Sequence, residues 1–162
     1  MIRPFPFSVL LLSLVANTAA AEDSPWDQPT PALDKPREMT VYRSPTCGCC
    51  KKWMAHMEKQ GFLLKDMPTA DMDEIKGKLG VPEYLASCHT AVVDGYLVEG
   101  HVPAGDVKKL LAAKKTTALG LAVPGMPAGT PGMEMGGKKD KFSVIVFDKQ
   151  GNADQYHEYV KY

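Results

Sequence analysis

The stretch Ser44-Pro45-Thr46-Cys47-Gly48-Cys49-Cys50 places three thiols within four residues, between a predicted strand and a predicted helix. The strand is predicted over residues 39–43. The helix is predicted over residues 51–60, because apolar side chains recur at positions 50, 53, 54 and 57 and Gly61 is a typical helix end. The three cysteines are therefore expected at a helix N-terminus, where free backbone N–H groups and the helix dipole favour thiolate over thiol.

Short strands and helices alternate after this stretch. Strands are predicted over residues 62–65, 90–93 and 96–99, with a hairpin turn at Asp94-Gly95, and helices over residues 71–79 and from Pro103 to about residue 115. The order β-α-β-α-β-β-α is that of the thioredoxin fold, in which right-handed crossovers bring the start of the first helix close to the loop before the third strand. Cys88 stands in that loop and is therefore expected beside Cys47, Cys49 and Cys50.

The C-terminal part of the chain extends this core. Residues 116–141 are rich in glycine and proline and are predicted to form one long loop, and loops of this length are often functional. The apolar run over residues 142–147 predicts a strand inside the sheet, and residues 155–160 predict a last strand at an edge. We therefore predict an α/β, thioredoxin-like fold with a C-terminal β-hairpin extension.

The N-terminal residues have the pattern of a signal peptide. Residues 1–21 contain Arg3, an apolar core over residues 5–15 and an Ala-Ala-Ala cleavage site, and the core is shorter than the roughly 20 residues that a membrane-spanning helix needs. Residues 22–38 contain four prolines among polar residues and are expected to form a disordered linker. The domain is therefore predicted over residues 39–162, in a bacterial periplasm and without membrane insertion after cleavage.

The charge balance and the cysteine spacing exclude several classes of function. Lys+Arg and Asp+Glu are both 19, which argues against nucleic acid or an anionic membrane as the main partner. Four cysteines in an exported protein would ordinarily form two disulfides. Three cysteines in one turn cannot staple distant parts of a fold, however, so the clustering indicates a redox or metal site.

The four cysteines favour the binding of a soft metal ion. Cys47 and Cys50 form a Cys-x-x-Cys dithiol, so disulfide exchange is one candidate function. Thioredoxin-type oxidoreductases carry a cis-proline just before the third strand, whereas this chain reads Cys88-His89-Thr90 there, which indicates a metal ligand. Cu(I) is the softest common ion, and zinc sites usually use paired Cys-x2–4-Cys knuckles that this chain lacks. Bridging over several Cu(I) ions would use all four sulfurs, so we expect a multinuclear Cu(I)–thiolate cluster.

Methionine and histidine side chains offer further ligands. Three methionines stand in the Gly/Pro-rich loop rather than on a helix face, and they are candidate copper ligands or transfer sites: Met126, Met133 and Met135. His89 adjoins Cys88, and His101 stands just before the third helix, so both are second-tier candidate ligands. His56 and His157 are expected at the surface.

Four motifs follow one another along the domain: Ser44-Pro45-Thr46-Cys47-Gly48-Cys49-Cys50, Ser87-Cys88-His89-Thr90-Ala91, Val98-Glu99-Gly100-His101-Val102-Pro103-Ala104, and residues 120–134 with their Pro-Gly-Met-Pro and Pro-Gly-Met-Glu pieces. In this order they closely resemble the CopG-type copper-resistance proteins of Gram-negative bacteria, long catalogued as a domain of unknown function. The resemblance implies a periplasmic protein of thioredoxin-like fold that binds copper in a thiolate-bridged cluster. By match of position, it implies Cys47, Cys49, Cys50 and Cys88 as the bridging ligands.

These observations predict a periplasmic copper-binding protein that contributes to copper resistance by holding Cu(I) in a cysteine cluster. One alternative is a redox enzyme that interconverts Cu(I) and Cu(II) or exchanges disulfides. Another is a protein that passes copper to a periplasmic efflux system or chaperone through its methionine loop. The proposed partners are thus copper ions and, for transfer, a second copper-handling protein.

Overall fold

The computed structural model describes residues 24–114 and 117–162, so the predicted signal peptide over residues 1–21 lies outside the described residues. Within these ranges the chain forms a seven-stranded sheet, three α-helices and two single turns of 3-10 helix. In chain order the elements are η1 (Pro25–Asp27), β1 (Arg37–Arg43), α1 (Gly48–Lys59), β2 (Phe62–Pro68), α2 (Met72–Leu79), η2 (Glu83–Leu85), β3 (His89–Val93), β4 (Tyr96–Glu99), α3 (Ala104–Ala113), β5 (Gly120–Ala122), β6 (Phe142–Phe147) and β7 (Ala153–Tyr159).

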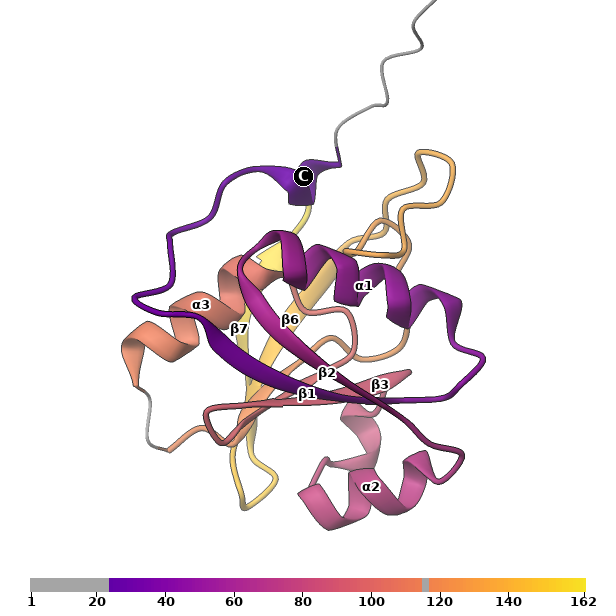
Figure 1. The fold of residues 1–162 in the computed structure, drawn as a ribbon, viewed down its shortest axis with the longest axis vertical. Helices are drawn as coiled ribbons and strands as arrows, with labels where there is room; N and C mark the ends of the chain where they lie inside the picture. The colour runs from indigo at the N-terminus through magenta and orange to yellow at the C-terminus, as the bar shows by residue number, and fades with distance from the viewer. Residues whose placement is uncertain (1–23, 115–116) are drawn as a thin grey trace, which may run out of the picture.

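The first four strands and the three helices have the thioredoxin-like arrangement that the sequence predicts. The strand order is β2-β1-β3-β4-β5-β6-β7, in which β1 and β2 are parallel and β3 runs antiparallel to both β1 and β4. Helices α1 and α3 cover one face of the sheet, and α2 covers the other (Figure 1). The larger apolar core lies under α1 and α3, where Trp53, Met57 and Leu110 are fully buried.

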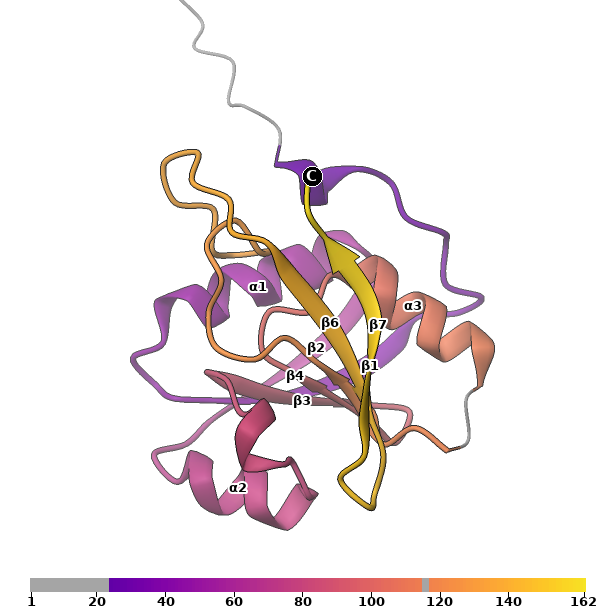
Figure 2. The same cartoon turned by 180° about the vertical axis from the view of Figure 1, so that it is seen from behind.

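The Gly/Pro-rich region contains a strand that the sequence did not predict. Residues 120–122 form β5, which pairs in parallel with β4 and antiparallel with β6, so the region is not one continuous loop. The strand is only three residues long and begins with glycine, so its sequence carries no alternating pattern. Its stability comes from pairing on both sides, and it links the core to the predicted hairpin of β6 and β7 (Figure 2).

The N-terminal segment was expected to be a disordered linker, but its described part packs against the domain. The Trp26 side chain is 8% exposed, and its ring lies within 6.2 Å, centroid to centroid, of the rings of Phe142, Tyr159 and Tyr162. Its indole Nε1–H donates to the Gly129 carbonyl oxygen at 2.7 Å. Burial of this large aromatic ring on the aromatic cluster anchors the segment to the domain at Trp26.

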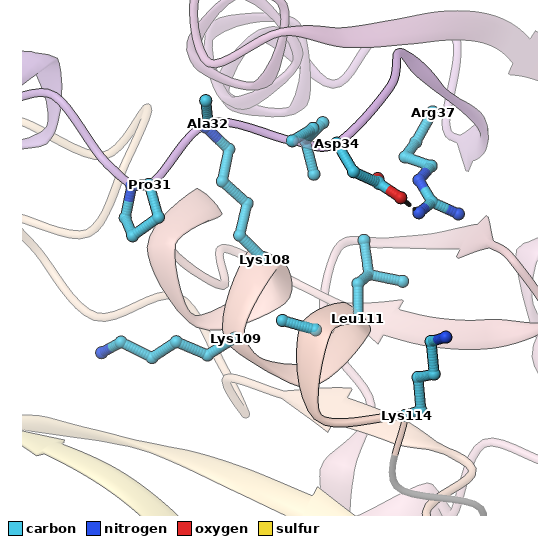
Figure 3. Close-up of a pocket in the computed structure, with 10 residues that line it drawn as sticks. Pro31, Ala32, Asp34, Arg37, Lys108, Lys109, Leu111 and Lys114 are labelled. Carbon is cyan, nitrogen blue, oxygen red and sulfur yellow. Dashed lines mark hydrogen bonds and ion pairs between the residues drawn. The ribbon is translucent and has the colours of Figure 1, made fainter.

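A pocket of about 340 Å³ separates this segment from α3 (Figure 3). It is lined by cationic side chains, among them Lys109 and Lys114, and by the Asp34–Arg37 ion pair. None of the cysteines lines it. At its edge the Lys108 ammonium donates to the Thr30 hydroxyl oxygen at 2.7 Å, and burial lowers the pKa of Lys108. Across the described ranges, no helix has the length and apolar character needed to span a membrane.

Candidate metal centre

Two loops at the same end of the sheet carry the four cysteines. The first connects β1 to α1, which begins at Gly48 rather than near residue 51. Cys47 is the N-cap residue, and its sulfur accepts the Cys50 backbone N–H at 3.3 Å. Cys49 and Cys50 therefore stand in the first helical turn, where the helix dipole favours negative charge. The second loop leads into β3 and carries Cys88.

The four cysteine sulfurs converge. Cys47, Cys49, Cys50 and Cys88 each offer a sulfur atom, and these four atoms all lie within 4.8 Å of one another. Metal–thiolate bonds are about 2.3 Å long, so two sulfurs up to about 4.6 Å apart can bind the same ion. The topology thus brings a residue 38 positions away from Cys50 to the tip of α1, as the strand order predicts.

Two of the four sulfurs are joined covalently in this structure. Cys47 and Cys50 form a disulfide with a Cα–Cα distance of 5.4 Å, while Cys49 and Cys88 are free thiols. The Cys49 sulfur lies 3.5 Å from the Cys47 sulfur. A disulfide sulfur is no longer a thiolate ligand. The centre therefore has an oxidised form with two free thiols, and it would have four only after reduction.

Two histidines extend the centre behind Cys88. The sulfur of Cys88 and one ring nitrogen each of His89 and His101 lie within 4.8 Å of one another. His101 Nε2 is 3.1 Å from the Cys88 sulfur, and its Nδ1 is 2.7 Å from the Pro131 carbonyl oxygen. Because a carbonyl oxygen only accepts, Nδ1 carries the proton and Nε2 turns a lone pair toward Cys88. This is the arrangement by which second-sphere groups fix the tautomer of a metal-binding histidine.

His89 is enclosed by the core. Its ring lies 4.3 Å from the Trp53 ring and 5.2 Å from the His101 ring, and its Nδ1 is 3.3 Å from the Cys88 sulfur. Its Nε2 is buried and finds no hydrogen-bond partner among the described residues. Both second-tier histidines thus adjoin the cysteine group, and each presents a nitrogen to it.

Burial sets the protonation states around Cys88. Desolvation, followed by the charge of Cys49, raises the pKa of the Cys88 thiol to about 12. Desolvation lowers the pKa of His101, and that of His89 falls well below its ordinary value for the same reason. Both imidazoles are therefore neutral, which is the form that binds metals. The expectation that a helix N-terminus favours thiolate does not extend to Cys88, because this cysteine stands in the other loop.

An ion pair holds the first loop. Arg43 at the end of β1 makes a bidentate pair with Asp66 on β2, at 2.9 and 2.6 Å. Its remaining nitrogen donates to the carbonyl oxygens of Ser44 and Pro45, at 3.0 and 3.2 Å. A planar guanidinium can satisfy a carboxylate and two carbonyls at once, so Arg43 fixes the backbone just before Cys47.

The Gly/Pro-rich loop packs directly on the start of α1. Gly132 has a φ of +82°, and a Cβ at this position would lie 2.5 Å from the Trp53 backbone nitrogen and 3.0 Å from the Cys49 carbonyl oxygen. The neighbouring Pro131 carbonyl is the one that accepts from His101. Only glycine permits this close approach, so the loop forms one wall of the centre.

Gly132→Ala should therefore detach this wall. We expect a loss of about 1–3 kcal/mol of unfolding free energy from overpacking, added to the left-handed strain of about 1–2 kcal/mol. Gly136→Ala is the matched control, because Gly136 has a φ of +59° in the same loop but open space around its Cβ position. Urea denaturation of both variants measures the difference. Equal losses of stability would show that Gly132 is required only for its backbone conformation.

The three loop methionines and the two remaining histidines differ in how far they are buried. Met126 and Met135 are 55% and 62% exposed, and Met133 is partly buried. His56 was expected at the surface but is buried, with Nε2 accepting the Ala104 N–H at 3.3 Å, and desolvation lowers its pKa to about 4. His157 is partly buried and contacts Asp106 at 3.0 Å.

Comparison with known proteins gives a consistent result. A family model described as "Protein of unknown function, DUF411" matches residues 85–133, which include Cys88 and both candidate histidines. No curated protein matches. A solved structure described as copper resistance protein CopG, form 2, is 46% identical with a TM-score of 0.74, and the alignment covers 78% of this chain and all of that one, 100%.

A second solved structure, described as copper resistance protein CopG, form 1, is 47% identical with a TM-score of 0.73. This alignment covers 77% of the present chain and 98% of the other. Identity at this level over essentially the whole length of both relatives, together with the shared fold, establishes the relationship. The chain belongs to the CopG family of copper resistance proteins.

Proposed function

We propose that this protein binds Cu(I) as its cargo in a multinuclear cluster bridged by Cys47, Cys49, Cys50 and Cys88. The observation that carries the proposal is the convergence of four sulfur atoms within 4.8 Å at one end of the sheet. Thiolates select soft ions, and four thiolates around one ion would leave a large negative charge. Several bridged Cu(I) ions would spread that charge and use every sulfur.

The surroundings of the sulfurs support the same proposal. Cys50 is fully buried and the other three are partly buried, so a bound cluster would be shielded from solvent and from oxidants. The neutral imidazoles of His89 and His101 stand ready as additional ligands. The relatives described as copper resistance proteins make copper the first metal to test. The signal-peptide pattern of residues 1–21 supports a periplasmic site of action.

Anaerobic titration of the fully reduced chain with Cu(I) tests the proposal. Native mass spectrometry should show more than one copper per chain, with the multiply loaded species appearing cooperatively because bridging thiolates are shared between ions. Zinc serves as the control metal and should not reproduce the multiply loaded species. A limit of a single copper per chain would rule out the cluster.

The Cys47–Cys50 disulfide favours a second candidate function, thiol–disulfide exchange. With an external thiol reductant supplied in excess, an exchange enzyme would reduce a small disulfide repeatedly and faster than the reductant alone, and Cys47→Ser would abolish that turnover. Without added reductant, a protein that only binds copper would reduce at most two equivalents of disulfide, because its four thiols can form no more than two disulfides. Counting turnovers of the copper-free chain separates the two functions.

A further inference from the structure

A buried ion pair lies on the face of the sheet opposite α1, beneath the loop that carries Cys88. Lys76 of α2 donates to Glu99 Oε1 at 2.5 Å, and the Glu99 side chain is completely buried. Thr90 on the adjacent strand accepts from Lys76 at 2.9 Å and donates to Glu99 Oε2 at 2.5 Å. The three side chains come from α2, β3 and β4, so their contacts join these three elements.

A buried ion pair is a poor way to stabilise a fold. Removing two charges from water carries a penalty of several kcal/mol per ion, and well-packed apolar residues of similar volume are often at least as stabilising. The pair therefore calls for an explanation other than stability. Its location supplies one, because the carboxylate has a third donor outside the Lys76–Thr90 contacts.

This third donor is the backbone of the cysteine loop. The Ser87 N–H, one residue before Cys88, donates to Glu99 Oε1 at 2.6 Å. The Ser87 hydroxyl donates to the Gly125 carbonyl oxygen. On its other side the loop packs tightly on Gly100, where a Cβ would lie 2.5 Å from the Ser87 Oγ. Ser87 is thus fixed at its amide, its hydroxyl and its Cβ.

We propose that Glu99, charged and oriented by Lys76 and Thr90, is a positioning residue that fixes Cys88 within reach of the other three sulfurs. The inference rests on the proposed function for its purpose, since Cys88 is the only cluster cysteine outside the α1 loop. Because Glu99 Oε1 accepts the Ser87 N–H directly, the position of this buried oxygen sets the position of the loop that carries Cys88. A positioning role of this kind acts through Cys88 and requires no contact between Glu99 and copper.

Two double variants isolate the anchor from the charge pair. Lys76→Met/Glu99→Gln removes both charges but keeps an amide oxygen that can accept the Ser87 N–H. Lys76→Met/Glu99→Leu removes the charges and the acceptor together. When the two variants are compared at matched thermal stability, any difference between them reports whether the side chain at position 99 accepts the Ser87 N–H. Thr90→Val, which has nearly the same shape, is a milder third variant that deprives Glu99 of one donor without leaving a charge unpaired.

The first readout needs no copper. In a Cys47→Ser/Cys50→Ser background, a thiol-specific fluorogenic cross-linker joins Cys49 to Cys88 at a rate that depends on their distance and orientation. The Gln variant should react at nearly the rate of that background, and the Leu variant at least about tenfold more slowly, because small displacements strongly reduce effective molarity. Equal rates in the two folded variants would overturn the inference. If the Leu variant does not fold, Thr90→Val must itself slow the cross-linking, and an unchanged rate there would equally overturn it.

The second readout is Cu(I) affinity, measured by competition with a chelator in the otherwise unmodified chain. The Leu variant should bind about 10- to 100-fold more weakly than the Gln variant, as is typical when a group that orients a ligand is lost. Equal affinities in the two would count against the inference. If neither these variants nor the unmodified chain bind Cu(I), the proposed function fails, while the cross-linking rates still decide whether Glu99 positions Cys88.

Discussion

Replacing Cys88 with serine is expected to abolish the multinuclear copper species. Cys88 supplies the sulfur from the second loop, and its three partners all come from the first turn of α1 or its cap. A hydroxyl oxygen is a hard ligand with little affinity for Cu(I), so the remaining thiolates would hold at most a single ion. Anaerobic titration should show this lower capacity, with a loss of affinity beyond the roughly 10- to 100-fold seen when only a neighbour of a ligand is lost.

Met67→Leu is a suitable control for this experiment. It removes a sulfur atom from β2, a strand that contributes nothing to the cysteine group, and should leave both capacity and affinity unchanged. Serine at position 88 also preserves the size of the side chain, so the fold should persist, as circular dichroism can verify. A Cys88→Ser chain that still bound several copper ions would show that the α1 loop alone builds the site.

Oxidation of the chain should have an effect of similar size. With the Cys47–Cys50 disulfide intact, only Cys49 and Cys88 remain as free thiols. Two thiolates cannot bridge several ions in the proposed way, so the oxidised chain should form no multinuclear species. Reduction with a phosphine that is removed before titration should restore full capacity. Native mass spectrometry reports the disulfide, through the loss of two hydrogen atoms, and the copper content of the same molecules.

The Cys49→Ser variant tests whether this redox dependence belongs to the Cys47–Cys50 pair. It keeps that pair and should still gain copper capacity on reduction, from a lower starting level. An oxidised wild-type chain that bound as much Cu(I) as the reduced chain would contradict the assignment of Cys47 and Cys50 as ligands. Copper uptake would then have to depend on sulfurs outside the disulfide.

Most of the core fold is predictable from the sequence because its signals are local. The Asp94-Gly95 dipeptide marks the hairpin between β3 and β4, and the apolar spacing of α1 defines its buried face. The sequence predicts the start of α1 later than the structure shows it, because cysteine is not a preferred N-cap residue. In the structure Cys47 nevertheless caps the helix through its sulfur. Strand β5 could not be predicted because the two strands it pairs with, β4 and β6, are distant from it in sequence.

The candidate centre could be predicted as far as its four cysteines and the two histidines beside Cys88. Their convergence follows from topology alone, but the groups that hold the loops depend on tertiary contacts. Glu99 stands at the end of a strand, where a charged residue is ordinarily solvated. Its partner Lys76 is 23 positions away, so no local sequence pattern predicts their contact. His56 is different: it stands three residues after Trp53 on α1, so its position on the apolar face was a usable signal of burial.

X-ray absorption at the copper edge, on reduced protein loaded anaerobically with Cu(I), tests the cluster most directly. The proposed structure predicts a Cu(I) edge, a first shell dominated by sulfur at about 2.3 Å, the usual length of a metal–thiolate bond, and a clear copper–copper contribution beyond it. A first shell of nitrogen or oxygen, or a sulfur shell with no copper–copper contribution, would contradict it.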